Sequence, residues 1–347
     1  MQPQSQGRKA RLSDVAEQAG VSEATVSRVL NGKPGVGAET RRAVLTALDV
    51  LGYERPAQLR TTSSGLVGLV VPELENPIFP AFAQAVESML SQRGYTSVLC
   101  TQTPGGVTED EYVEMLLARG VSGIVFISGL HADATSDKAR YRRLVDQGLP
   151  VVLVNGFTDE VVAPFISTDD TFAMRLAVNH LAALGHRRIG LAIGPTRYVV
   201  AQRKVDGFLA ASQTLLGIGA ADAEAMVERT LFTVEGGHAA ATRLLDKGAT
   251  AIVCGSDLMA LGVVRAVRAR GGQVPTDVSV VGFDDSPLIS FTDPPLTTIR
   301  QPVAAMSQAA VQALAEAISG HDAPTGEYLF SPELIVRGST AAAPGAR

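Results

Sequence analysis

The most informative side chains of this sequence are short polar groups and one arginine, close together in residues 23–28. Glu23, Ala24, Thr25, Ser27 and Arg28 share the polar face of a helical pattern in the segment SEATVSRVL. Hydroxyl groups donate to phosphate oxygens, and an arginine can donate to both O6 and N7 of guanine. The segment therefore predicts a helix that lies in the major groove of DNA.

Two further helices are expected to position this segment. Ser13 is the predicted N-cap of the first helix, and Gly20 suits the left-handed turn between Ala19 and Val21. The second helix opens on Ser22, and a third ends at Gly52. The apolar positions expected to form one shared core are Leu12, Val15, Ala16, Ala19, Val26, Val29, Leu30, Val44, Leu45, Leu48 and Leu51.

From residue 66 onward, apolar strand-like runs alternate with helical segments. The runs are 66–72, 96–101, 123–128, 150–155, 188–195, 251–256 and 278–285. The helical segments between them include those around 79–93, 170–184, 201–216, 235–247 and 257–270. This alternation predicts parallel sheets covered by helices on both faces, divided into two α/β lobes, with a cleft at the carboxyl ends of the strands.

Composition and charge narrow the class of protein. Residues 1–60 hold 9 Lys and Arg against 6 Asp and Glu, whereas the remainder holds 21 against 29, so a basic head precedes an acidic body. Cys100 and Cys254 form no CxxC pair, and we expect buried free thiols, no metal site and no cofactor. The absence of a long apolar stretch and of a secretory leader pattern predicts a cytoplasmic protein without a membrane span.

Five ordered blocks of sequence resemble the LacI/GalR family of bacterial transcriptional regulators. They are SDVAEQAGVSEATVSRVLNG, LVGLVVPELENPIFP, LAALGHRRIGLAIGP, SDLMALGVVRAVRARGGQVPTDVSVVGFDD and PPLTTIRQP. The resemblance implies a multidomain chain, with an all-α helix-turn-helix domain and an α/β, periplasmic-binding-protein-like core of two Rossmann-like subdomains. The expected boundaries are 1–52 for the DNA-binding domain, 53–65 for the linker and 66–340 for the core, whose lobes are 66–168 with 300–328 and 169–299 with 329–340.

The resemblance also implies which residues contact DNA. Glu23, Ala24 and Arg28 match the base-reading positions of the family, and the expected phosphate-side residues are Leu12, Ser13, Thr25, Ser27 and Asn31. Leu59 falls where the family has the leucine of its hinge helix, which enters the minor groove. The alternatives are ordinary helix surface for Thr25 and Ser27, a solvated charge for Arg28, and an incidental apolar residue in the short, Pro56-containing linker for Leu59.

Effector-contacting residues are expected at the strand ends. The candidates are Ile78, Phe79, Ser128, Asn155, Arg203, Lys204, Phe232, Ser256, Asp284 and Gln301. Lys204 stands where relatives have an arginine, and Asn155 where many have an aspartate, while the two phenylalanines have core packing as their alternative. Asp284 has turn capping as its alternative, Asp257 is an N-cap or a ligand, and Asp170 is expected to cap the next helix.

These expectations combine into a sequence-specific transcriptional repressor. A homodimer would bind a near-palindromic double-stranded operator, and a small effector, expected to be a carbohydrate with purines as the alternative, would change its DNA affinity. A plain solute-binding protein would need an export signal and would lack residues 11–52. An enzyme is disfavoured because the chain has no GxSxG, GxxxxGK[ST] or HExxH motif.

Overall fold

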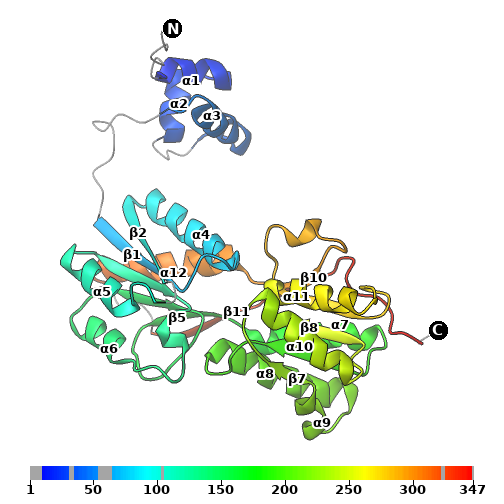
Figure 1. The fold of residues 1–347 in the computed structure, drawn as a ribbon. Coiled ribbons are helices and arrows are strands. Elements are labelled where there is room, and N and C mark those ends of the chain that lie inside the picture. Colours follow the sequence, from blue (N-terminus) through cyan, green and yellow to red (C-terminus); the bar gives the residue numbers. More distant parts are fainter. Residues whose placement is uncertain (1–9, 31–34, 54–64, 103–104, 322–324, 346–347) are drawn as a thin grey trace, which may run out of the picture. The chain divides into compact units, whose positions relative to one another are not determined.

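The computed structural model describes residues 10–30, 35–53, 65–102, 105–321 and 325–345, in two compact units (Figure 1). The first unit is Met1–Ser63 and the second is Ser64–Arg347. Asn31 and Leu59, both predicted DNA contacts, lie outside the described residues. The division between the units falls inside the predicted linker.

The first unit packs three helices around one small core. They are α1 (Leu12–Ala19), α2 (Glu23–Leu30) and α3 (Ala38–Val50). The fully covered core residues are Val15, Ala16, Val26, Val29, Val44 and Ala47. Gly20 ends α1 with φ 66° and ψ 32°, as predicted, since glycine has no Cβ to oppose a left-handed turn.

Two local predictions in this unit are wrong. Arg11, not Ser13, precedes the first turn of α1, because the Asp14 carboxylate accepts a hydrogen bond from the Arg11 N–H at 2.7 Å. Leu45 is 53% exposed, because the buried stripe of α3 runs through Val44 and Ala47 and leaves Leu45 to one side.

The first lobe of the second unit is a six-stranded parallel sheet in the order β11-β5-β4-β3-β1-β2. Its strands are β1 (Gly65–Val71), β2 (Tyr95–Thr101), β3 (Gly123–Ile127), β4 (Val151–Val154), β5 (Pro164–Thr168) and β11 (Gly326–Phe330). Its helices are α4 (Ile78–Gln92), α5 (Glu109–Ala118), η2 (Leu130–Ala132), α6 (Ala139–Asp146) and α12 (Val303–Ile318). Two separate buried clusters, around Phe82 and around Tyr141, contain residues of the same central strands.

The second lobe repeats this plan with the order β12-β10-β9-β8-β6-β7, in which only β12 runs antiparallel. Its strands are β6 (Ile189–Ile193), β7 (Val227–Arg229), β8 (Ala251–Cys254), β9 (Ser279–Asp284), β10 (Thr297–Arg300) and β12 (Glu333–Ile335). Its helical segments are α7 (Asp170–Ala183), α8 (Val199–Ala211), η3 (Ser212–Leu216), α9 (Ala220–Ala225), α10 (Val234–Asp246), α11 (Asp257–Ala269) and η4 (Ile289–Phe291).

Within the described residues, the chain passes between the lobes at three places. These are the junctions of β5 with α7, β10 with α12, and β11 with β12 (Figure 1). β11 belongs to the first sheet up to Phe330, two residues past the expected lobe boundary. The carboxyl ends of the parallel strands carry the loops in which the effector-binding candidates were predicted.

Candidate functional site

The N-terminal half of α2 presents a short, largely exposed polar face, which we call the recognition surface. Glu23, Ala24 and Arg28 are exposed, whereas Thr25 and Ser27 are partly buried. Ser22 fixes the start of this helix, because its Oγ accepts a hydrogen bond from the Thr25 N–H at 3.2 Å. Its Oγ also lies 3.0 Å from the Thr25 Oγ1, so the Thr25 hydroxyl is already partly engaged.

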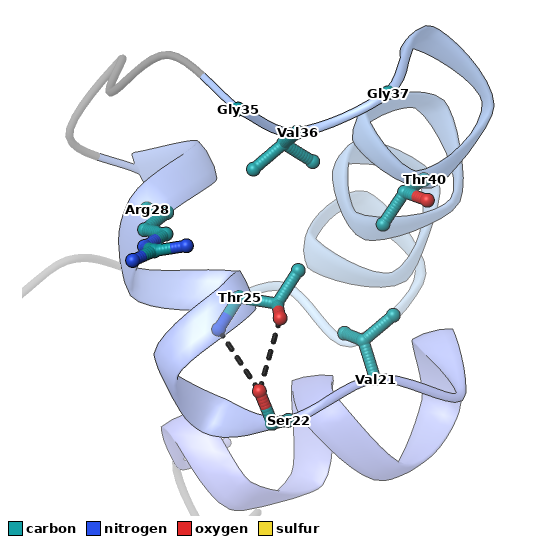
Figure 2. A pocket seen from close by; sticks show the side chains of 8 residues that line it. All are labelled: Val21, Ser22, Thr25, Arg28, Gly35, Val36, Gly37 and Thr40. Atoms are coloured by element: carbon teal, nitrogen blue, oxygen red, sulfur yellow. Dashed lines mark hydrogen bonds between the residues drawn. The ribbon is translucent and has the colours of Figure 1, made fainter.

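An open depression of about 340 Å³ adjoins the recognition surface (Figure 2). Arg28 and Thr25 line one side of it, and Val36, Gly37 and Thr40 line the other. Gly37 precedes α3 and supplies no capping side chain. The amides of a first helical turn are donors that an anion such as a DNA phosphate can accept from. The sequence predicts a loop before α3 and an outward-facing Thr40, but it did not single out either as a DNA contact.

The other predicted phosphate-side residues behave differently from one another. Ser13 is exposed on α1. Leu12 is only partly exposed and packs against the core of the three helices.

In the second unit, the strongest polar arrangement lies where the two lobes meet, and we call it the inter-lobe site. Asp284, at the end of β9, accepts a hydrogen bond at 2.7 Å from the Gln301 Nε2, and the Gln301 Oε1 accepts one at 2.8 Å from the Thr168 Oγ1. The side chain of Asn76, from the loop after β1 in the first lobe, also donates to Asp284. Residues from both lobes and from two chain crossings therefore share one hydrogen-bonded chain.

Lys204 has a buried acidic partner beside this chain. Its Nζ lies 2.6 Å from the Asp170 Oδ1, and both side chains are at least 94% buried. The same ammonium stands 4.0 Å from the centre of the Phe283 ring. Asp170 was expected to cap α7, but Asp169 is the cap, since its carboxylate accepts from the Phe172 N–H at 2.8 Å.

Arg203, also predicted to bind an effector, pairs with an acidic side chain of the other lobe. Its two terminal nitrogens donate to the Glu327 carboxylate at 2.6 and 2.9 Å. A bidentate pair of this kind uses the whole fork of the guanidinium. Lys204 is the cation whose charge acts on Asp284.

Asp257 forms a second buried carboxylate near Asp284. It accepts hydrogen bonds at 2.7 Å from the Ser286 N–H and at 2.7 Å from the Thr298 Oγ1, so it acts neither as the N-cap of α11 nor as a free group. The cap is Ser256, whose Oγ accepts from the Met259 N–H at 3.3 Å. Burial, together with repulsion from Asp257, raises the pKa of Asp284 well above its ordinary value.

Left-handed backbone is concentrated at the same strand ends. Among the described residues other than glycine, positive φ occurs at Ser128 (46°), Asn155 (59°), Asp284 (116°) and Asp285 (59°). Such conformations cost about 1–3 kcal/mol each and persist where the surroundings fix them, commonly at binding sites. Ser128, Asn155 and Asp284 were predicted effector contacts; the first two directly follow β3 and β4, and Asp284 ends β9.

The remaining candidates lie near these ends without joining the bonded chain. The Phe232 ring packs over Gly194 and Gly255, where an added Cβ would collide with it, and it stays partly exposed. Ile78 is 94% buried in the core of the first lobe, and Phe79 packs beside that core. Asn76 was missed by the sequence reasoning, although it directly precedes the Pro77-Ile78 pair.

The described residues hold neither a membrane-spanning helix nor a metal-binding cluster. None of their helices is long and apolar enough to cross a membrane. No group of three or more His, Cys, Asp or Glu side chains in that part of the chain is placed to hold a metal ion.

Comparison with known proteins gives two family matches. Residues 11–56 match the family described as bacterial regulatory proteins, lacI family, and residues 178–340 match a periplasmic binding protein-like domain. The chain is 64% identical to the HTH-type transcriptional regulator MalR of Streptomyces coelicolor, over 97% of this chain and 98% of the relative.

Two solved structures of transcriptional regulators resemble this fold over nearly the whole chain. A complex of the transcriptional regulator CelR with cellobiose is 31% identical, with a TM-score of 0.69, covering 95% of this chain and all of the other. A lac repressor dimer bound to operator and the anti-inducer ONPF is 30% identical, with a TM-score of 0.68, covering 96% of this chain and all of the other. These relatives are DNA-binding transcriptional regulators and not enzymes. The chain belongs to the lacI family of bacterial regulatory proteins.

Proposed function

We propose that this protein is a transcriptional repressor whose affinity for a near-palindromic operator is controlled by a neutral carbohydrate bound at the inter-lobe site. In this proposal, residues 1–52 bind the operator and residues 66–340 bind the effector and form a homodimer. Residues 53–65 link these two domains. Because its partner is bacterial DNA, it acts in the cytoplasm.

The observation that carries the effector proposal is the chain of Asn76, Gln301 and Thr168 around Asp284. A carboxylate accepts from hydroxyl groups, and amides both donate and accept, which suits the hydroxyl groups of a sugar. The solved CelR relative, whose bound ligand is cellobiose, supports the same class. Phe232 adds a partly exposed ring against which an apolar sugar face would pack.

The charges of the site argue for a neutral sugar rather than a phosphorylated one. Asp284 and Asp257 are buried there, and Lys204 is already paired with Asp170 at 2.6 Å. A phosphate group would meet two carboxyl groups and no unpaired cation in the described part of the site. Its desolvation would then be uncompensated.

An exposed apolar surface on the second lobe supports the homodimer. Leu288 and Phe291, in the loop between β9 and β10, are 74% and 84% exposed. They belong to one turn, because the Phe291 N–H donates to the Leu288 carbonyl at 3.1 Å, and burial of both against a second copy would remove their apolar surface from water. The lac repressor relative, which binds its operator as a dimer, supports a two-fold arrangement, which would place two recognition surfaces on two half-sites.

The DNA part is tested by selecting binding sites from random double-stranded DNA with the purified full-length protein. We expect a sequence with approximate two-fold symmetry, and an affinity that falls steeply as salt rises because phosphate contacts release counterions. Recovery of no preferred sequence, or binding that ignores ionic strength, would contradict the proposal.

The effector part is tested by thermal shift with neutral sugars, sugar phosphates and purines. A ligand present at about 100 times its Kd stabilises the folded state by about 2.7 kcal/mol. We expect a neutral sugar to raise the Tm and then to release the selected DNA. Stabilisation by sugar phosphates or purines alone would refute the neutral-sugar assignment.

A further inference from the structure

The loop of residues 128–138, which follows β3 in the first lobe, is held rigidly by buried polar groups. The Lys138 Nζ donates to the carbonyl oxygens of Leu130 and Ser136 at 3.0 Å each, and to that of Asp133. Three carbonyls around one ammonium fix the course of the loop, and Lys138 is only 2% exposed. The loop is therefore a preformed element rather than a free segment.

A second group of buried side chains fastens the same loop to the sheet. The Glu109 carboxylate accepts from the Leu130 N–H at 3.0 Å and from the Tyr141 hydroxyl, which itself accepts from the His131 N–H at 2.8 Å. The His131 Nε2 lies 3.2 Å from the carbonyl oxygen of Val154 at the end of β4. The loop and the strand ends of the first lobe thus form one rigid body.

This rigid loop contacts the second lobe through backbone and side chain together. The Ala134 N–H donates to the Arg197 carbonyl at 2.8 Å, and Asp133 pairs with Tyr198 in an isolated antiparallel bridge. The Arg197 Nε lies 3.1 Å from the Asp133 Oδ2, whose other oxygen is held by Thr135 at 2.7 and 2.9 Å.

We propose that Asp133 and Ala134 of the first lobe and Arg197 and Tyr198 of the second form a clasp that closes the inter-lobe site. Both halves follow the carboxyl ends of inner strands, β3 and β6, at the edge of each sheet that carries the site residues. The lobes cannot part at this edge without breaking these bonds. Opening of the clasp therefore sets how fast a ligand enters and leaves.

The bonds of the clasp are weak enough to break and re-form. The Arg197 side chain is 54% exposed, so its ion pair is screened by water and contributes little, whereas the Asp133 side chain is 7% exposed and stays fixed. Each bond across the clasp is individually weak, and the rigid loop keeps its shape when they break. The inference extends the proposed effector site, but its test needs no effector.

The test measures how fast a thiol reagent reaches the inter-lobe site. Ser256→Cys places a thiol at a position that is 1% exposed, just after β8. Methanethiosulfonate ethylammonium is applied to the full-length protein, and modification of each cysteine is followed by peptide mass spectrometry. Native Cys254, which is fully buried in the core of the second lobe, reports global unfolding in the same sample.

The triple variant Ser256→Cys/Arg197→Ala/Asp133→Ala is compared with Ser256→Cys alone. We expect its introduced thiol to react about threefold to tenfold faster, because the exposed ion pair is lost and the backbone pairing is weakened. Modification of Cys254 should not change. Arg265→Ala is the matched control, since Arg265 pairs with Glu235 within one lobe and is 55% exposed. An unchanged rate at the introduced thiol, or equal acceleration at Cys254, would overturn the clasp and leave the proposed repressor function untouched.

Discussion

Replacing Lys204 by methionine should destabilise the second unit far more than removing the neighbouring cation. Lys204 and Asp170 form a pair at 2.6 Å, with both side chains at least 94% buried. Removing one partner of a buried pair leaves an uncompensated charge, which costs about 3–5 kcal/mol. The Arg203 side chain is 27% exposed, so its pair with Glu327 is partly hydrated, and Arg203→Met should cost about 1 kcal/mol.

The double variant Lys204→Met/Asp170→Asn separates a structural pair from an effector ligand. With both charges gone, no charge is left unpaired, so we expect it to recover at least about 2 kcal/mol relative to the sum of the single variants. The assay is urea unfolding followed by far-UV circular dichroism, because the chain contains no tryptophan.

Three outcomes of these measurements distinguish the roles of Lys204. A cost below about 1 kcal/mol for Lys204→Met, or additive single costs in the double variant, would refute the buried-pair argument. If the double variant is stable and still binds the sugar found by thermal shift, Lys204 supports the site and does not contact the ligand. Loss of sugar binding in that stable variant would make Lys204 a ligand contact, as its sequence position predicted.

Three further predictions concern DNA, pH and assembly. Arg28→Ala should reduce discrimination between operator and random DNA by about 1–3 kcal/mol in fluorescence anisotropy, whereas Arg42→Ala, exposed on α3, should reduce it little; equal effects would argue against base contact by Arg28. Burial lowers the pKa of His131 from 6.5 to about 3, so the unfolded chain takes up a proton below pH 6.5 while the folded chain does not. The free energy of unfolding therefore loses nothing through His131 above pH 6.5, and it falls by about 1.4 kcal/mol per pH unit between pH 6.5 and pH 3. The variant His131→Phe should lack this contribution to the slope when urea unfolding is measured at a series of pH values. Phe291→Glu should weaken self-association at least about tenfold in sedimentation velocity, and an unchanged dimer would place the interface elsewhere.

Local patterns predicted the helical elements of the first unit because each depends on near neighbours. The apolar spacing of Val15, Val26 and Val44 and the left-handed turn at Gly20 are set within one or two turns of chain. Leu45 failed because the position of the buried stripe on α3 depends on packing against α1 and α2. The apolar pattern predicted that α3 is a helix, but not which of its faces packs against the other two helices.

In the second unit, several elements could not be predicted from local sequence patterns. Seven strands were visible as apolar runs, but β5, β7, β10, β11 and β12 were not predicted. β7 and β12 have three residues each and lie at sheet edges, so no periodicity marks them. β5 was missed although all five of its residues are buried. α12 was not among the predicted segments, although its buried residues Met306, Ala310, Val311 and Leu314 follow helical spacing over 16 residues. These elements are defined by the partners they pair or pack with.

In the inter-lobe site, too, some features were predictable from local sequence and others were not. Positions after the strands were predictable, because parallel strands end at one edge of a sheet. The partners Asp170, Glu327 and Thr168 were not, since they lie 34, 124 and 133 residues from the groups they bind. The positive φ values of Ser128 and Asn155 also depend on the folded surroundings, because neither residue type requires them.

The bonds around Asp284 suggest how the proposed effector would act on the whole molecule. In this structure its carboxylate is held by Gln301, beside one crossing of the chain, and by Asn76 of the other lobe, while Gln301 is held in turn by Thr168 at another crossing. A sugar hydroxyl that bonds to Asp284 must share or displace these amides, so binding changes the bonds that relate the lobes. A ligand shifts a two-state equilibrium only through such differential contacts. Gln301→Leu should therefore alter the coupling between sugar and DNA binding more than either affinity alone, measured as the ratio of DNA affinities with and without the sugar. An unchanged ratio would show that the coupling does not pass through this chain of hydrogen bonds.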